Sequence, residues 1–392
     1  MKVIHFVIDD KFINGMIAVL DEIEEMDNHY YILSTNETFK YISTDRVQRI
    51  DETEVMDIIT DPKRCDVIVI HGLMSMPFQF IKTIDKQIKV VWLSWGYDIY
   101  TNHTYPYAPL IPLKNRIKPG TLNFLNKLIY YFKWLEKEYV MRIFKMKEDS
   151  KRNFIPALSR IDYFSGVYPI EYDLIKANNS FFNAKPISFH YFSLGTKARY
   201  LQENIYKDSF VKGKNIQVGH NAMRYGNHRN SFNLLKDLKL EGKKIITPLS
   251  YPNYTGKQSY VSSVCKYGYK LFKDQFVPMT KFMPIEEYRD YMSSISVAIY
   301  NFERQAAAGN IKMNLWNGTM VFMPDKSIGY KYFKSLGFHI YSIEHDLTQE
   351  NIDKGLSEDQ IIENRKILSQ TNTYEILMSD IIRSFREIYR DK

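Results

Sequence analysis

The sequence is poor in cysteine and has no long apolar run. Its 392 residues include two cysteines, Cys65 and Cys265, which are too few and too far apart for a disulfide framework or a cysteine-based metal site. This favours a reducing compartment such as the cytoplasm. The apolar N-terminus ends at Asp9 and Asp10, too early for a signal peptide, and no stretch approaches the roughly 18 apolar residues of a membrane-spanning helix. Any membrane contact is therefore expected to be peripheral.

Short motifs of several enzyme classes are missing as well. There is no HExxH, nucleophile elbow, Walker loop or kinase signature, and no Asp-x-Asp pattern of the kind that holds a divalent cation in many nucleotide-sugar enzymes. We therefore expect chemistry without a metal and without a bound cofactor. With 45% hydrophobic and 25% charged residues, the composition is that of a soluble globular protein and excludes a disordered chain or a rod.

The net charge of +8 is concentrated in one segment. Residues 114–152 carry eleven basic and four acidic side chains, which accounts for nearly the whole excess. Apolar residues recur in this segment at helical spacing and predict an amphipathic helix over about 120–147. Such a helix either lies on an anionic membrane or packs on its own domain with its basic face in solvent. No recognised nucleic-acid-binding module accompanies it, so we expect no nucleic-acid partner.

Short runs rich in Val and Ile alternate with helical patterns along the chain. In the first half, the strand-like runs are 3–8, 29–33, 67–71, 89–94, 163–167 and 187–192. In the second half, they are 215–218, 244–248, 269–272, 297–300 and 319–323. The alternation predicts an α/β protein with two doubly wound, Rossmann-like units, each built on a parallel sheet.

A polar stretch at 195–213 shows no periodicity and marks the expected domain boundary. We expect an N-terminal domain over 1–205 and a C-terminal domain over 206–370. The remaining residues, 371–392, form an amphipathic pattern that predicts a helix bracing one unit against the other.

In doubly wound sheets, ligands bind beyond the carboxyl ends of the strands, so the loops there hold the candidate site residues. After the first strand of the second half, Gly219 allows the backbone to turn sharply. His220 and Asn221 offer hydrogen bonds to a phosphate, and Arg224 offers positive charge. The pattern is also compatible with a plain turn.

A second loop, between a later strand and a helix, is rich in small residues. Arg304 and Gln305 are suited to hold a diphosphate, and Glu303 to bind a hydroxyl group. The helix that opens at Gly309 and Asn310 would direct unpaired N–H groups and its positive dipole end at an anion. The alternative is that the small residues only permit tight packing.

Two further loops offer walls for a planar group. Tyr251 lies between two prolines after a strand, where its ring would stack on a base. Met283 precedes a proline at a predicted helix start, where the backbone would line a base pocket. The alternative for Tyr251 is a rigid turn without a ligand, and the alternative for Met283 is a simple helix start.

One loop of the first half directly follows an apolar strand. In it, Trp95 and Tyr100 are candidates for stacking on a sugar, and Asp98 for accepting a proton from a hydroxyl group or anchoring it. Asp10 and Asn14 follow the very first strand and are expected at the same edge of the sheet. An isolated Asp after a strand is also a common cap residue.

Together these loops resemble the bacterial lipid II N-acetylfucosaminyltransferase family, the 4-acetamido-4,6-dideoxy-galactose transferases. The shared residues occur in the family's order between positions 95 and 309. They are Trp95, Gly96, Asp98, Tyr100, Val218, Gly219, Arg224, His228, Pro248, Tyr251, Pro252, Met283, Pro284, Tyr288, Phe302, Arg304, Gln305 and Gly309. The sequence departs from the family at His220, Asn221, Met223 and 306–308.

The resemblance implies a glycosyltransferase of the GT-B type, with two Rossmann-like domains facing across a cleft. It implies transfer of a 4-acetamido-4,6-dideoxy-galactose type sugar from a dTDP donor to an undecaprenyl-diphosphate-linked saccharide in surface polysaccharide synthesis. The lipid-linked acceptor implies a peripheral enzyme at the cytoplasmic face of the bacterial inner membrane, which favours the membrane interpretation of the basic helix.

The same resemblance implies roles for the site residues. The donor diphosphate would lie near Gly219, Arg224, Gln305 and the helix opening at Gly309, with Arg304 stabilising the leaving charge in place of a metal. Asp98 would bind the acceptor or act as the base. Two alternatives stay open: a GT-B transferase using a UDP or GDP sugar for O-antigen or capsule, and a non-catalytic, membrane-associated sugar-nucleotide binding protein.

The membrane interpretation predicts the effect of a charge reversal. Replacing Lys127, Lys133, Lys137 and Lys145 by Glu removes the attraction between the basic helix and anionic lipid. We expect the wild-type protein to sediment with anionic vesicles and the variant not to, with neutral vesicles as the control. Unchanged sedimentation would exclude the membrane role.

Overall fold

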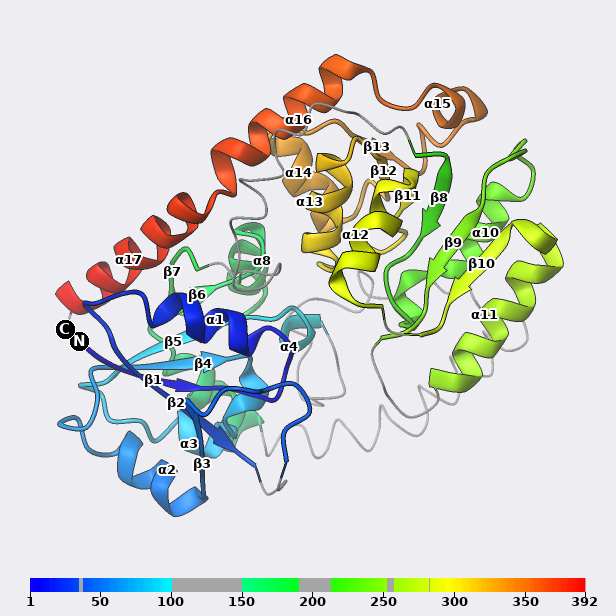
Figure 1. The fold of residues 1–392 in the computed structure, drawn as a ribbon. Helices are drawn as coiled ribbons and strands as arrows, with labels where there is room; N and C mark the ends of the chain where they lie inside the picture. Colours follow the sequence, from blue (N-terminus) through cyan, green and yellow to red (C-terminus); the bar gives the residue numbers. More distant parts are fainter. Residues whose placement is uncertain (35–37, 101–149, 190–212, 252–256, 282, 392) are drawn as a thin grey trace. The chain divides into compact units, whose positions relative to one another are not determined.

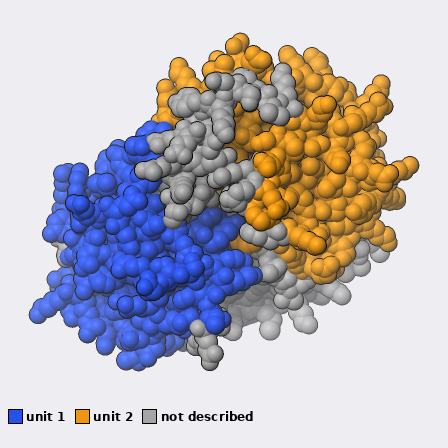
Figure 2. Space-filling model, viewed as in Figure 1, with its two compact units in different colours: residues 1–112, 131–201, 372–392 blue, residues 113–130, 202–371 orange. Residues whose placement is uncertain are grey.

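The computed structural model describes the chain except for residues 35–37, 101–149, 190–212, 252–256, 282 and 392. Its residues form two compact units (Figure 2). Unit 1 takes its residues from 1–112, 131–201 and 372–392, and unit 2 takes its residues from 113–130 and 202–371. The predicted basic helix over about 120–147 and the predicted domain boundary at 205 both lie outside the described residues.

Unit 1 is built on a seven-stranded parallel sheet with the order β3-β2-β1-β4-β5-β6-β7 (Figure 1). Its strands are β1 Lys2–Phe6, β2 Asp27–Leu33, β3 Val47–Ile50, β4 Val67–His71, β5 Lys89–Leu93, β6 Tyr163–Ser165 and β7 Lys185–Pro186. All residues of β4, and all but the first of β1 and β5, are buried. This burial is what a parallel sheet covered on both faces requires, and it explains the continuous apolar runs in the sequence.

Helices cover both faces of this sheet. They are α1 Ile13–Leu20, α2 Glu52–Ile59, η1 Leu73–Ser75, α3 Phe78–Ile81, α4 Tyr97–Tyr100, η4 Ser150–Phe154, α7 Ile155–Ser159, α8 Ile170–Asn178 and α17 Tyr374–Arg390. Figure 1 shows α1 and α17 on one side of the sheet, with α2 and α3 on the other. The helix predicted near the C-terminus is thus observed as α17.

The apolar stripe of α17 is used inside unit 1. Leu377, Ile381, Phe385 and Ile388 follow helical spacing and are buried in the same core cluster as residues of α1 and the sheet. Thr373 is the N-cap residue of this helix, and its side chain accepts a hydrogen bond from the backbone N–H of Ile376. Since each fully buried large side chain contributes about 1.5–3 kcal/mol, this stripe ties the end of the chain firmly to unit 1.

Unit 2 repeats the architecture with a six-stranded parallel sheet of order β10-β9-β8-β11-β12-β13. Its strands are β8 Asn215–Val218, β9 Ile245–Pro248, β10 Phe276–Met279, β11 Ile295–Ile299, β12 Met320–Met323 and β13 Ile340–Ser342. Its helices are η5 Arg224–Gly226, α10 His228–Leu235, α11 Lys257–Phe272, η6 Lys273–Gln275, α12 Ile285–Ser293, α13 Ala308–Trp316, α14 Ile328–Ser335, α15 Gln349–Lys354 and α16 Glu358–Thr371. The predicted doubly wound α/β class is therefore confirmed for both units.

One predicted strand of unit 2 is wrong. Residues 269–272 form the last turn of α11, and the strand lies a few residues later, as β10. A short aromatic run fits either the end of a helix or a buried strand, and only packing decides between them. Phe272 and Phe276 both pack edge-on against Phe232, with ring centroids 5.7 and 5.4 Å from it. The end of α11 and the start of β10 therefore pack on the same core residue.

A polar seam crosses the core of unit 1. The amide of Asn28 in β2 donates to the backbone oxygen of Leu20, which leaves its oxygen facing His5 Nε2 at 3.0 Å. His5 Nε2 must then carry the proton, so its Nδ1 accepts from Nε2 of His71, 2.9 Å away. Both rings are fully buried. Burial lowers the pKa of His5 to about 4 and holds the pKa of His71 well below its ordinary value.

These buried histidines predict acid sensitivity. In the unfolded chain they titrate near 6.5, so between about pH 6.5 and pH 4 the unfolded state binds protons that the folded state does not. We expect the free energy of unfolding to be highest above pH 6.5 and to fall with decreasing pH, by about 1.4 kcal/mol per pH unit for each such histidine. Urea unfolding at several pH values tests this, and the slope should become shallower in His71→Gln. A stability that does not change from pH 7 to pH 4.5 would contradict it.

Candidate active site

The candidate site follows from the strand order. In unit 2, β8 and β11 are neighbours, but the chain goes from β8 towards one edge of the sheet and from β11 towards the other. In unit 1, the same switch occurs between β1 and β4. Doubly wound sheets bind ligands beside the carboxyl ends of two such strands. The loops that follow these strands contain most of the residues predicted from the sequence.

In unit 2 the two predicted donor loops are brought together. The ring of His220, after β8, lies edge-on to the ring of Phe302, after β11, with centroids 5.4 Å apart. Tyr225 also meets Phe302 edge-on at 6.1 Å. The guanidinium carbon of Arg304 lies 4.6 Å above the ring of Tyr225. Aromatic and cation–π contacts therefore join the two loops.

Gly219 forms the turn at the end of β8. Its φ of +71° lies in the left-handed region that favours glycine. Its N–H donates to the backbone oxygen of Ile299 at 2.9 Å, which joins the end of β8 to the end of β11. Its own carbonyl accepts from the side chain of Gln217 at 2.8 Å, and that amide also donates to the hydroxyl of Tyr300 at 3.1 Å. A polar layer beneath the loop thus fixes the turn.

The polar side chains after the turn hold the loop together. Asn221 Nδ2 lies 2.9 Å from Nε2 of His220 and donates to the hydroxyl of Tyr225 at 2.8 Å. Asn221 Oδ1 accepts from the backbone of Met223 at 3.0 Å. Asn221 is nearly fully buried. Its amide is consequently engaged in the shape of the loop, and His220 lies nearer the surface.

Two arginines rest on aromatic rings at this site. Arg304 is 9% exposed, and its Nε donates to the backbone oxygen of Gln305 at 3.1 Å. Arg224 is exposed, with its guanidinium carbon 5.2 Å above the ring of Tyr260. Stacking orients both cations, and a hydrogen bond adds to this at Arg304, which reduces the entropy lost when an anion is bound.

The start of α13 lies at the end of the same loop. Its N-cap residue, Ala307, has a φ of +58°, an uncommon conformation for a residue with a side chain. Gly309 and Asn310 are half-buried in the first turn, so the helix begins one residue before the predicted start. Glu303 is half-buried, and its backbone oxygen accepts from Ile328 N at 3.0 Å.

The remaining predicted donor residues lie at neighbouring strands. Tyr251, after β9, is half-buried, and its backbone oxygen accepts from Ala222 N at 2.7 Å, which joins the β9 loop to the Gly219 loop. Met283 is half-buried and lies immediately before Pro284, the N-cap of α12. Tyr251 is thus directly connected to the candidate site through its backbone.

In unit 1, Asp98 connects two loops. Its Oδ2 accepts from Trp92 Nε1 at 2.8 Å and from Leu73 N at 3.3 Å, and its Oδ1 accepts from Ser94 Oγ at 3.0 Å and Trp95 N at 3.1 Å. The carboxylate is 1% exposed, and burial raises its pKa above the ordinary value while the hydrogen bonds lower it. The structure thus gives Asp98 a positioning role between the loops after β4 and β5. Its role as a base stays a prediction.

The aromatic residues at this edge differ in exposure. Trp95 is half-buried and meets the rings of Phe12 and Tyr97 edge-on, with centroids 6.1 and 6.3 Å away. Tyr100 is 4% exposed, and its hydroxyl donates to the carboxylate of Glu171 at 2.9 Å inside the unit. The stacking face predicted for Tyr100 is therefore turned into the core. Phe12 and Tyr97 are the half-buried neighbours of Trp95 instead.

The two polar residues after β1 shape loops. Asp10 Oδ1 accepts from the backbone of Phe12 at 3.2 Å, and burial raises the pKa of this carboxyl group. Asn14 donates to the backbone oxygen of Tyr41 at 2.8 Å and accepts from the backbone of Ser43 at 3.0 Å. The nitrogen and the oxygen of the Asn14 side-chain amide are thus both used in holding a neighbouring loop.

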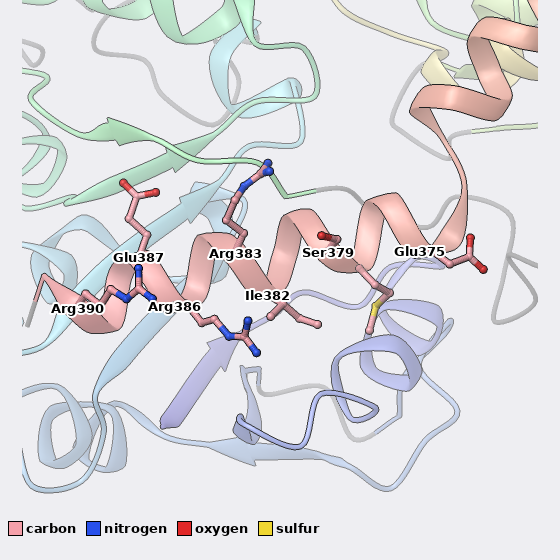
Figure 3. A pocket seen from close by; sticks show the side chains of 8 residues that line it. Glu375, Ser379, Ile382, Arg383, Arg386, Glu387 and Arg390 are labelled. Atoms are coloured by element: carbon pink, nitrogen blue, oxygen red, sulfur yellow. The ribbon is translucent and has the colours of Figure 1, made fainter.

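A depression of about 720 Å³ lies elsewhere on unit 1, along α17 (Figure 3). It is lined by Glu375, Met378, Ser379, Ile382, Arg383, Arg386, Glu387 and Arg390. All of these residues belong to α17, and none belongs to a loop after a strand. We therefore do not include this depression in the candidate site.

The described residues show neither a metal-binding cluster nor a membrane-spanning helix. They contain no group of three or more His, Cys, Asp or Glu side chains arranged to hold a metal ion. No helix among them is long and apolar enough to cross a membrane. Chemistry without a metal or cofactor stays an expectation from the sequence.

Comparison with known families now identifies the kind of protein. Residues 164–376, more than half of the chain, match the model of the family described as 4-alpha-L-fucosyltransferase, glycosyl transferase group 56. The chain belongs to this family. It is a glycosyltransferase, and the match covers the loops of unit 2 described above. The comparison with curated proteins gives no match.

Solved structures share the fold of this glycosyltransferase at low sequence identity. The Anabaena protein Alr3699/HepE, in complex with UDP and glucose, has 9% identity and a TM-score of 0.58, with 99% of each chain covered. The α,α-trehalose 6-phosphate synthase of Burkholderia multivorans has 9% identity and a TM-score of 0.57, with 100% of this chain and 99% of that chain covered. These likenesses confirm the predicted GT-B class.

Sequence reasoning gave no role to several residues at the two switch points of this glycosyltransferase. They are Phe12, Tyr97, Tyr225, Phe302 and His228. Each lies within ten residues after a strand or in the first turn of the following helix, which is a usable signal. The residue type alone does not distinguish the aromatic ones from core residues, because the sequence does not show whether a ring is directed into the core or towards a ligand.

The four hydrogen bonds to Asp98 predict the cost of removing its charge. In Asp98→Asn, an amide nitrogen would face two N–H donors, so we expect the free energy of unfolding to fall by about 2–4 kcal/mol. Urea unfolding measures this, with Asp57→Asn on the exposed face of α2 as the control, expected within about 0.5 kcal/mol of wild type. Lost turnover at unchanged stability would instead assign Asp98 to the chemistry.

Proposed function

We propose that this glycosyltransferase moves a sugar of the 4-acetamido-4,6-dideoxy-galactose type from a dTDP donor to an undecaprenyl-diphosphate-linked saccharide in bacterial surface polysaccharide synthesis. The observation that carries the proposal is the meeting of the Gly219 loop with the Arg304 loop at the switch point of unit 2. The dTDP sugar and the lipid-linked acceptor rest on the resemblance of the loop residues to the N-acetylfucosaminyltransferases.

The chemistry requires stabilisation of a leaving diphosphate. The bond between the anomeric carbon and the diphosphate oxygen breaks, the acceptor oxygen bonds to that carbon, and the acceptor's proton passes to a base. Negative charge develops on the diphosphate as it leaves. In this proposal, the guanidinium of Arg304, which rests on Tyr225, and the positive end of α13 stabilise that charge, with Arg224 as a second cation.

Unit 1 supplies a surface suited to a saccharide. The rings of Phe12, Trp95 and Tyr97 form a half-buried aromatic cluster, and aromatic rings are the side chains on which sugar rings stack. Asp98 fixes the backbone of Trp95 and so the placement of this ring cluster. An acceptor anchored in lipid would bring the enzyme to the cytoplasmic face of the inner membrane as a peripheral protein, with the basic segment as the contact to anionic lipid.

A UDP donor is the second candidate, because the similar Anabaena structure is a complex with UDP and glucose. Release of free nucleotide from a panel of dTDP, UDP and GDP sugars separates the candidates. We expect turnover with a dTDP 4-acetamido-4,6-dideoxy sugar and a lipid diphosphate saccharide. Preference for UDP or GDP donors would reject the dTDP assignment, and no turnover with any donor would reject the proposed reaction.

Removal of the Arg304 cation tests the role of the donor loop. We expect Arg304→Ala to lower kcat by about 10²–10³-fold, since it removes a preorganised positive charge from the leaving group. Arg49→Ala is the matched control, because Arg49 also stacks on a ring, that of Phe39 at 3.9 Å, but lies in β3 of unit 1. Steady-state kinetics with the donor measure both. An Arg304→Ala enzyme with wild-type kcat contradicts the role.

A further inference from the structure

His228 lies beneath the donor loop and has no role in the function described so far. It is the first residue of α10 and is 0% exposed. Its ring is packed between two glycines of the loop. A Cβ at position 219 would lie 2.5 Å from Nε2, and a Cβ at position 226 would lie 2.9 Å from Cε1. The loop therefore has no side chains at the two positions that adjoin this imidazole.

One nitrogen of the ring is bonded and the other is not. His228 Nδ1 lies 2.7 Å from the hydroxyl of Tyr260 in α11. Nε2, directed at Gly219, is buried and has no hydrogen-bond partner among the described residues. Burial lowers the pKa of His228 to about 4, so the ring is neutral near pH 7. A buried polar atom left without a partner is rare and points to a missing ligand or water.

The start of α10 adds a second feature that suits an anion. The N-cap residue, Asn227, makes no side-chain hydrogen bond to the first turn. Its amide donates instead to the backbone oxygen of Asn301, after β11, at 2.8 Å. The side chain that normally caps a helix is thus used to join the two donor loops. The first N–H groups of a helix have no acceptor within the helix, so the start of α10 offers donors to an anion.

We propose that His228 is a ligand of the donor diphosphate, with its neutral Nε2–H donating to a phosphoryl oxygen beside Gly219. The backbone of Gly219 covers Nε2 in the free protein, since even a Cβ at this position would lie 2.5 Å from it, so the oxygen reaches Nε2 only when the turn moves. Since solvent does not reach Nε2 in the free protein, binding includes a shift of the Gly219 turn onto the phosphate. The inference deepens the proposed function and rests on it for the identity of the phosphate.

Tyr260 sets the tautomer that this role needs. A neutral imidazole has one N–H, so Nε2 donates only when Nδ1 is the acceptor of a hydrogen bond. In that arrangement the hydroxyl of Tyr260 donates to Nδ1 and leaves the proton of the ring on Nε2. The ring then recognises phosphate as a neutral donor, while the positive charge at the site is supplied by Arg224 and Arg304.

Two substitutions of His228 separate its nitrogens. The amide nitrogen of Gln reaches the position of Nε2, whereas that of Asn reaches only the position of Nδ1. In the full-length protein, we expect His228→Asn to raise the Kd of dTDP by about 10–100-fold, the loss of one hydrogen bond to a charged group. His228→Gln should stay within about threefold of wild type. The Kd of thymidine, which has no phosphate, should change less than about twofold in both variants.

Several results would overturn the inference. One is that His228→Asn binds dTDP as tightly as the wild-type protein does. Another is that His228→Asn loses as much affinity for thymidine as for dTDP, which indicates a purely structural role. If His228→Asn does not fold, Tyr260→Phe replaces it. We then expect dTDP to bind several-fold more weakly and the ¹⁵N-histidine spectrum to lose the Nε2–H form, and no change in either measurement refutes the assignment.

A further measurement distinguishes failure of this inference from failure of the proposed function. If the wild-type protein binds none of the nucleoside diphosphates, the proposed donor is wrong, and inorganic pyrophosphate becomes the probe. Pyrophosphate binding that is lost in His228→Asn and kept in His228→Gln still supports an anion ligand at Nε2. Pyrophosphate binding that is the same in all three proteins, or absent from all, overturns it.

Discussion

The candidate donor site depends on one structural constraint, the parallel pairing of β8 with β11. At this point the order in which the chain adds strands to the sheet of unit 2 reverses. The pairing sets Ile299 beside Val218, and the N–H of Gly219 continues the ladder to the oxygen of Ile299. The next residues of both strands therefore leave the sheet at the same height. This is why His220 and Tyr225 meet Phe302, and why Arg304 has a ring on which to rest.

The two units use one architecture for different purposes. At the switch point of unit 1, the polar side chains are engaged within the fold: Asp98 joins two loops and Asn14 holds a third. What is left partly exposed there is a cluster of aromatic rings. At the switch point of unit 2, Arg224 is exposed, His220 and Tyr225 are half-buried, and the first turn of α13 carries the half-buried Gly309 and Asn310. In the proposed function, unit 2 binds the diphosphate of the donor and unit 1 binds the saccharide acceptor.

The sequence predicted the alternation of strands and helices, and with it the loops in which the site lies, because buried parallel strands leave continuous apolar runs. It did not predict the direction of individual side chains. Asp98 and Tyr100 follow a strand as a site residue would, but their neighbours Trp92 and Glu171 draw them into the core. The strand predicted at 269–272 is wrong for a related reason. The sequence pattern there fits a helix end or a strand, and packing on Phe232 decides for the helix end. His228 was visible only as part of a resemblance, because its environment is made by residues from three separate elements.

A crystal of the protein soaked with dTDP is the most direct test of the central claim, that the diphosphate is held between the loops after β8 and β11. The account predicts density for the diphosphate beside Gly219, within hydrogen-bond distance of Arg304 or of the backbone at the start of α13. Density for dTDP at the depression along α17, or at any place away from both loops of unit 2, would contradict it.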